Sequence, residues 1–163
     1  MPVILILSVF WLLSFFLPVE QLAVCTGSPW WTFFTYSFVH VCFLHLAVNS
    51  IVFWTYYRII RKSEIIFIIP LCIAVPALSA LMACSDVPTC GFSAVISTLM
   101  GYYMSGCSRT VFFKSLSLVI FSYVFTGIFA EGVNTLIHVY SFTGSFVMSL
   151  IYRMVMQCFR NRR

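Results

Sequence analysis

The stretch that decides the fold is residues 65 to 84, IIFIIPLCIAVPALSALMAC, which contains no charged side chain. A helix of about 20 apolar residues is long enough to cross the hydrocarbon core of a bilayer. The prolines at 70 and 76 are tolerable there, because neighbouring helices can satisfy the carbonyls that they free. The stretch therefore predicts a transmembrane helix.

The composition extends this prediction to the whole chain. Of its 163 residues, 62% are hydrophobic and 8% are charged, which leaves too little polar surface to coat a water-soluble globule. Further apolar spans are predicted at about 33–57, 92–107, 111–130 and 136–157, with an N-terminal anchor at 2–18. We therefore predict an all-α, polytopic membrane protein, a six-helix transmembrane bundle that forms a single domain over residues 1–163. The short span at 92–107 is rich in serine and glycine and is expected inside the bundle.

The basic residues fall on one side of this predicted bundle. Lysine and arginine are retained on the cytoplasmic side of membrane proteins. The loops on the opposite side carry Glu20, Asp86 and Glu131 and no basic residue. If the number of predicted helices were wrong by one, basic residues would fall on both sides, so the pattern supports the count of six. Both termini are therefore expected in the cytoplasm. The basic positions are Arg58, Arg61, Lys62, Arg109, Lys114, Arg153, Arg160, Arg162 and Arg163.

The basic C-terminal tail does not indicate a nucleic-acid partner. A basic cluster next to a membrane helix is an orientation signal that also meets anionic lipid. The predicted spans take up almost the whole chain, so no separate domain remains that could bind a nucleic-acid groove. The lipid bilayer is the expected partner of this tail.

The seven cysteines do not form the disulfide framework of a small secreted domain. Cys84 and Cys90 both lie near the outer loop before the span at 92–107. A bridge between them is open on geometric grounds, although spacing alone does not establish pairing.

Polar side chains occur where hydrocarbon is expected. All three histidines, His40, His45 and His138, lie in or at the edge of predicted spans, toward the outer side. A polar or ionisable group inside a membrane is costly and so indicates a functional site. Asn49 follows His45 by four residues and shares its helical face, and Ser93 opens a span on the same side of the membrane. Polar groups from three helices are thus predicted to converge at one depth.

Two stripes of small residues predict which helices touch. In lipid, close helix contact depends on small residues at the interface. If the two stripes face each other, the hydroxyl of Ser93 can form a hydrogen bond with the His138 imidazole. An activated nucleophile requires such a bond, with a length of about 2.6 to 3.2 Å. The first stripe is Ser93, Ser97, Gly101 and Ser105, and the second, after His138, is Ser141, Ser145 and Ser149.

These groups suit nucleophilic catalysis. A serine hydroxyl needs a base to take its proton, and histidine can do so near neutral pH. The oxyanion that forms on attack needs donors, which His45, Asn49 and the backbone N–H of Ser93 can supply. The nearest carboxylates in sequence, Glu131 and Asp86, each lie seven residues from a candidate catalytic residue. The sequence therefore predicts a dyad without an orienting carboxylate.

The motifs and their order resemble the rhomboid intramembrane serine proteases, over nearly the whole chain and with the bacterial-type six-helix core. The resemblance lies in His40 to Asn49 (HVCFLHLAVN), in the nucleophile motif Gly91 to Ala94 (GFSA), in residues 99 to 102 (LMGY) and in His138. It implies cleavage of transmembrane-anchored proteins near the outer interface, with lateral substrate entry past the span at 111–130. It also implies a bacterial inner membrane as the location.

The same resemblance assigns a role to each site residue. It implies that Ser93 is the nucleophile and His138 the base. It implies that His45 and Asn49 line the oxyanion site and that His40 lies near its rim. Gly91 belongs to the nucleophile motif.

The chain departs from the family pattern at four positions. Thr32 stands where an arginine often follows tryptophan in the first outer loop. Ser97 stands where an aromatic residue often packs on the catalytic histidine, and Ser141 and Ser145 replace glycines. These departures are expected to affect activity or substrate choice without removing the dyad.

Two other classes of function stay open at this point. One is a catalytically silent rhomboid-like protein that binds transmembrane segments, and the other is a cofactor or transport role. His40 and His45 are five residues apart and diverge on a helix, and the chain contains no His-Glu-x-x-His pattern. We therefore expect no metal and no cofactor.

Overall fold

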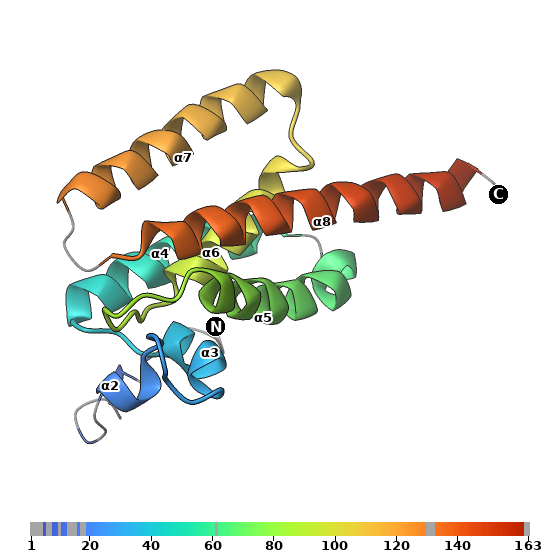
Figure 1. The fold of residues 1–163 in the computed structure, drawn as a ribbon. Coiled ribbons are helices and arrows are strands. Elements are labelled where there is room, and N and C mark those ends of the chain that lie inside the picture. The colour runs from blue at the N-terminus through green and yellow to red at the C-terminus, as the bar shows by residue number, and fades with distance from the viewer. Residues whose placement is uncertain are drawn as a thin grey trace.

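The computed structural model describes residues 5, 8–9, 11–12, 16, 19–60, 62–129 and 133–161. Over these residues the chain is all-α, as predicted (Figure 1), and its extended pairing is a single antiparallel bridge between Val24 and Thr89. The expected anchor at 2–18 falls largely outside the described residues, as do Arg61, Glu131, Arg162 and Arg163 of the charge pattern. The helices are α2 (Val19–Leu22), α3 (Thr32–Thr35), α4 (Phe43–Ile59), α5 (Ile65–Met82), α6 (Ser93–Met104), α7 (Arg109–Phe129) and α8 (Thr135–Asn161), with 3-10 turns η1 (Tyr36–Phe38) and η2 (Lys62–Glu64).

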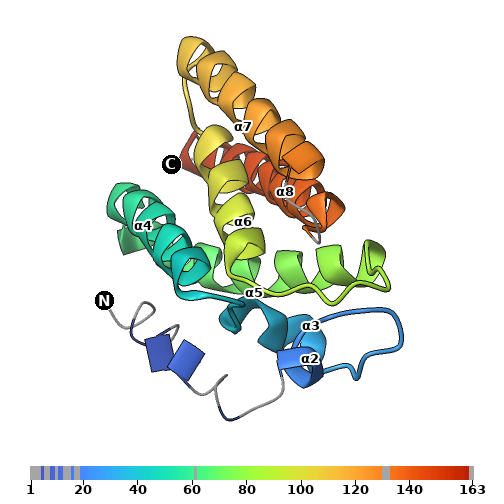
Figure 2. The ribbon, with the colours of Figure 1, turned by 90° about the vertical axis from the view of Figure 1, so that its left-hand side faces the viewer.

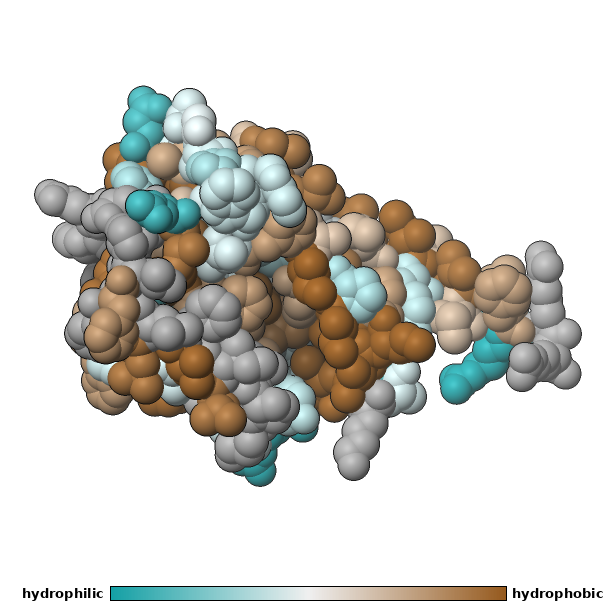
Figure 3. All heavy atoms as spheres, turned by 90° about the horizontal axis from the view of Figure 1, so that it is seen from below, coloured by the Kyte–Doolittle hydropathy of each residue, from teal (hydrophilic) through white to brown (hydrophobic). Residues whose placement is uncertain are grey.

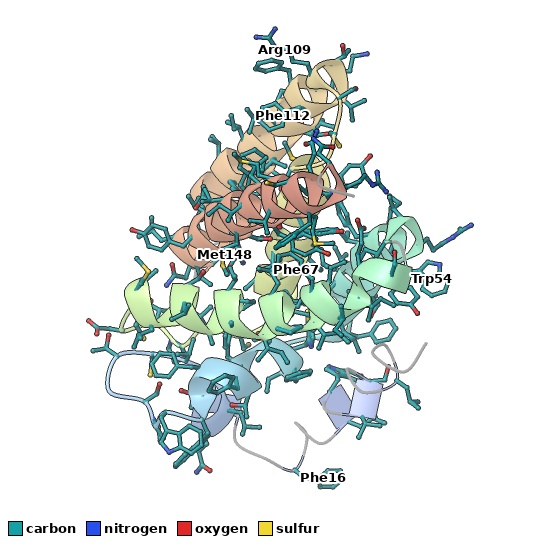
Figure 4. All side chains as sticks on the ribbon, turned by 90° about the vertical axis from the view of Figure 1, so that its right-hand side faces the viewer. Phe16, Trp54, Phe67, Arg109, Phe112 and Met148 are labelled. Atoms are coloured by element: carbon teal, nitrogen blue, oxygen red, sulfur yellow. The ribbon has the colours of Figure 1, made fainter. Side chains whose placement is uncertain are left out.

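The stretch at 65–84 forms a transmembrane-length helix, as predicted. It is α5, which ends at Met82 and keeps both prolines inside the helix. By length and composition, α5 and α8 can each cross a membrane, and the bent pair Thr32–Phe38 and Phe43–Ile59 adds a third candidate span if it is counted as one. Phe67 of α5 points into the bundle, where it stacks on Tyr152 of α8 with ring centroids 4.0 Å apart (Figure 4).

The predicted single span at 33–57 is wrong in one respect, because it is broken. The helix of α3 and η1 meets α4 at an angle of 92°. The chain leaves the helical region at Val39 (φ −92°, ψ 143°) and is still extended at Cys42 (φ −156°, ψ 164°). The break turns His40 inward, where 1% of its surface is exposed. Hydropathy is continuous across this segment, so the sequence pattern gave no sign of the break.

The short helix α6 lies inside the bundle, as its composition predicted. Figure 2 shows it in the middle of the fold, with α4 on one side, α8 on the other and α5 across its start. The contact with α8 is close, because a Cβ at Gly101 would overlap the carbonyl oxygen of Phe142. The hydroxyl of Ser145 donates to the carbonyl oxygen of Thr98 at 2.6 Å. The two small-residue stripes therefore meet as predicted.

A polar cluster joins the ends of α5, α6 and α8 that lie away from Ser93. Glu64 accepts a hydrogen bond from the hydroxyl of Tyr102, and its carboxylate lies 3.8 Å from the Arg153 guanidinium. That guanidinium also lies over the Tyr102 ring, 4.9 Å from its centroid. Glu64 is thus an acidic residue on the side where basic residues gather, and its charge is paired with one of them.

The outer surface of the bundle is apolar. Large side chains such as Ile66 and Leu118 are 83% and 70% exposed. Figure 3 shows hydrophobic residues over much of the face seen from below. Exposed apolar area on this scale suits contact with lipid rather than water.

The close approach at Gly101 gives the first testable prediction. Gly101→Ala should lower the unfolding free energy in detergent by about 2 kcal/mol, because the new methyl group meets backbone rather than a movable side chain. The measurement is the thermal unfolding midpoint of the purified protein.

Gly144→Ala on α8 is the matched control, since its Cβ would lie 3.5 Å from Val75, an ordinary contact. Equal midpoints for the two variants would contradict the close packing of α6 on α8.

Candidate active site

Ser93 is the first residue of α6, and a tight turn holds it there. Gly91 precedes it with a φ of +123°, which favours glycine over residues with a side chain. The N–H of Gly91 donates to the carbonyl oxygen of Tyr36 at 2.8 Å, and the N–H of Phe92 donates to His40 Nε2 at 3.4 Å. The turn is therefore fixed by the segment that breaks the predicted second span.

Ser93 and His138 are brought together by the packing of α6 on α8. The Oγ of Ser93 lies 2.8 Å from Nε2 of His138, although 45 residues separate them in sequence. Both side chains are half-buried. The distance lies in the range in which an imidazole can take a proton from a hydroxyl. The predicted proximity of these two residues is thus present in the structure.

The predicted oxyanion residues face the same turn from α4. A Cβ on Gly91 would lie 2.5 Å from His45 Cε1, 2.7 Å from His45 Nε2 and 3.7 Å from Asn49 Nδ2. A side chain at 91 would therefore displace the His45 ring. Among the described residues, the buried Nδ2 of Asn49 has no hydrogen-bond partner. It is a donor available to a group that enters beside Ser93.

His40 lies in the break before α4. Its ring meets the His45 ring edge-on, with centroids 5.1 Å apart, and its Nε2 accepts the Phe92 N–H. Because it is 1% exposed, it contacts the N-terminus of α6 from within the protein. The structure thus brings His40, His45, Asn49, Ser93 and His138 into one region.

Sequence reasoning missed Tyr123 of α7. Its hydroxyl donates to Ser97 Oγ at 2.9 Å, and its ring centroid lies 6.0 Å from that of His138. The span at 111–130 is rich in phenylalanine, whose simplest interpretation is contact with lipid. One signal was available, since a tyrosine inside an apolar span needs a partner for its hydroxyl.

A competing nucleophile lies three residues before Ser93. The thiol of Cys90 is free, as are all seven cysteines, so a bridge from Cys84 to Cys90 is not formed. Burial raises the pKa of Cys90 to about 11, which keeps it protonated at neutral pH. Ser93 is the better candidate, because its hydroxyl is hydrogen-bonded to a base, His138.

Among the described residues, no three histidine, cysteine, aspartate or glutamate side chains are placed to hold a metal ion. The chemistry that the described groups offer is proton transfer from Ser93 to His138, with hydrogen-bond donors on the α4 side of the turn. This arrangement fits acyl transfer through a serine nucleophile.

Comparison with known proteins adds one match. The family model described as the rhomboid domain matches residues 27–155, a range that contains every candidate site residue. No curated protein matches the chain.

The 2.8 Å contact between Ser93 and His138 predicts selective labelling. A serine-directed fluorophosphonate should modify Ser93 in the detergent-solubilised protein, because His138 makes its hydroxyl nucleophilic. Mass spectrometry of the digested protein would locate the label. Ser93→Ala should abolish labelling, and His138→Ala should slow it about a hundredfold or more.

Ser79→Ala is the matched control, since the Ser79 hydroxyl is bonded to its own helix at Val75. Label on another serine, with Ser93 unmodified, would contradict the assignment of the nucleophile.

Proposed function

Because the chain belongs to the rhomboid family, which includes serine proteases, we propose that it is an intramembrane serine endopeptidase that cleaves transmembrane-anchored proteins. The chain is an integral, multi-pass membrane protein. The observation that carries the proposal is the 2.8 Å contact between the Ser93 hydroxyl and the His138 imidazole. Among the described residues at the site, this is the pair in which a hydroxyl is hydrogen-bonded to an imidazole.

The reaction begins with proton transfer. His138 Nε2 takes the proton of the Ser93 hydroxyl while Oγ attacks the carbonyl carbon of the scissile peptide bond. The carbonyl oxygen becomes an oxyanion. When the tetrahedral intermediate collapses, His138 gives the proton to the leaving amine, the C–N bond breaks and an acyl-enzyme forms at Ser93. Water, deprotonated by His138, then hydrolyses the ester and restores Ser93.

The oxyanion would form beside the turn at Gly91. The unpartnered Nδ2 of Asn49 and the ring of His45 lie beside Gly91, and together with the backbone N–H of Ser93 they would supply the donors. Donors that are already oriented stabilise the developing charge without reorganisation. His40 supports this arrangement by holding the Phe92 N–H and packing on His45.

The distribution of basic residues supports cleavage near the outer surface. The polar cluster of Glu64, Tyr102 and Arg153 lies at the far end of α6 from Ser93. With basic residues retained in the cytoplasm, Ser93 then faces the outer leaflet and both termini lie in the cytoplasm. We place the protein in a bacterial inner membrane. Substrates would enter laterally past α7, the outermost helix in Figure 1.

A substrate helix must unwind locally before it is cut. The carbonyls of an intact helix are bonded within the helix and shielded from attack. Segments with small or helix-breaking residues near the outer interface are therefore the expected substrates.

Both dyad residues should be required for cleavage. Ser93→Ala and His138→Ala should each abolish cleavage of a single-span transmembrane substrate in liposomes, because either change removes the proton-transfer pair. Ser117→Ala on α7 is the control, since that hydroxyl bonds the Lys114 carbonyl of its own helix. The measurement is product formation on a gel.

Two results would contradict the proposal. Equal turnover by either dyad variant would remove the assigned residues from the reaction. Retention of the substrate by the native chain without cleavage, together with an unlabelled Ser93, would favour the catalytically silent binder.

Asn49 should contribute rate rather than stability. Asn49→Ala should lower kcat about a hundredfold, the cost of one oxyanion donor. Its unfolding midpoint should stay close to that of the native chain, because Nδ2 has no partner to lose. A lowered midpoint with an unchanged kcat would assign Asn49 to packing.

A further inference from the structure

Helix α7 lies against the rest of the fold through one face. Phe112, Leu116, Val119 and Tyr123 recur every three or four residues and pack with Met104 of α6 and Phe142 of α8. The opposite face is open, with Leu118 and Phe121 70% and 67% exposed. Figure 4 labels Phe112 on this helix and Arg109 at the end of it that is far from α5. Tyr123 is the member of the packed face nearest the other end.

Tyr123 contacts both helices that carry the dyad. Its hydroxyl lies 2.9 Å from Ser97 Oγ on α6 and 3.4 Å from the carbonyl oxygen of His138 on α8. Its ring lies beside the His138 ring, with centroids 6.0 Å apart and planes inclined by 30°. Ser97 is one helical turn after Ser93 on the same stripe of α6. Tyr123 therefore touches the base directly and is tied to the helix of the nucleophile.

This contact matters because the described hydrogen bonds of His138 include none to a carboxylate. Ser93 holds the ring at Nε2, and that bond must break and re-form during each turnover. An imidazole ring turns about a broad torsion unless its neighbours fix it. The Tyr123 ring stays in place while the Ser93 proton moves, because its hydroxyl is anchored on Ser97.

We propose that Tyr123 is a positioning residue for His138, and that Ser93 reaches full reactivity only while α7 is docked on α6 and α8. The proposal rests on the proposed function of the dyad. The Tyr123–Ser97 hydrogen bond is the link, since a shift of α7 away from α6 would break it and withdraw the ring from His138. The helix past which substrates enter would then also control the base.

The test compares variants that separate the hydroxyl from the ring. Tyr123→Phe should slow fluorophosphonate labelling of Ser93 about fivefold, as expected for one lost neutral hydrogen bond. Tyr123→Leu, which also removes the ring, should slow labelling further. Tyr140→Phe on α8, two residues after His138, and Leu118→Ala on the open face of α7 are the matched controls and should label at the native rate.

The double variant tests the link itself. Ser97→Ala and Tyr123→Phe remove opposite partners of one hydrogen bond, and Tyr123→Phe also removes the contact with the His138 carbonyl, so the double variant should slow labelling no more than Tyr123→Phe does alone. If the two effects multiply, the residues act independently and the proposal is wrong. The pH dependence of the labelling rate should shift in Tyr123→Phe and stay native in Tyr140→Phe, because only Tyr123 adjoins the base.

A measurement that does not need catalysis keeps this proposal distinct from the proposed function. The imidazole ¹⁵N shifts of His138, followed against pH by NMR on histidine-labelled protein, should change in Tyr123→Phe. If native Ser93 is not labelled but the shifts change, the proposed function fails and the positioning by Tyr123 is supported. If labelling is native and neither the rate nor the shifts change in Tyr123→Phe, the positioning role is overturned and the proposed function is untouched.

Discussion

The rest of the structure depends on the close contact between the backbones of α6 and α8. At Gly101 there is no room for a side chain, because the carbonyl oxygen of Phe142 occupies the space. Two helices that approach this closely in lipid are held by packing and by short polar contacts such as Ser145 to Thr98. The same contact determines the distance between Ser93 and His138 near the N-terminal ends of the two helices. The packing of α6 on α8 therefore also sets the geometry of the site.

Two of the four departures from the family pattern, Thr32 and Ser97, make contacts of their own in this structure. Thr32 is fully buried, and its hydroxyl bonds Ser28 at 2.8 Å and the Pro29 carbonyl at 2.7 Å, which fixes the loop before α3. Serine at 97 leaves a gap beside His138 that the Tyr123 ring fills from α7. A short side chain on one helix and a long one on its neighbour give the same contact. Sequence position alone therefore does not show whether a contact is lost.

Much of the fold followed from the sequence, and the parts that did not share a physical reason. Apolar runs predicted α5 and the other long helices, and the spacing of small residues predicted that Ser93 meets His138. The break between η1 and α4 was missed, because the segment stays apolar while its backbone becomes extended at Val39 and Cys42. Tyr123 and Glu64 were missed because each depends on a partner distant in sequence, Ser97 in one case and Arg153 in the other. Periodicity reports one helix at a time, and neither Tyr123 nor Glu64 belongs to a stripe of small residues that would indicate which helix it faces.

The shortness of α6 bears on the depth at which the proposed site would lie in a membrane. Twelve residues of helix rise about 18 Å, whereas the hydrocarbon core is about 30 Å thick. If the Tyr102 end is anchored near the cytoplasmic surface by Glu64 and Arg153, the Ser93 end stops well below the outer one. A charged or polar group at that depth is stable only with partners or water. His40, His45, Asn49 and His138 gather around the Ser93 end of α6, so the short helix and the polar side chains beside its first turn form one polar region inside the fold.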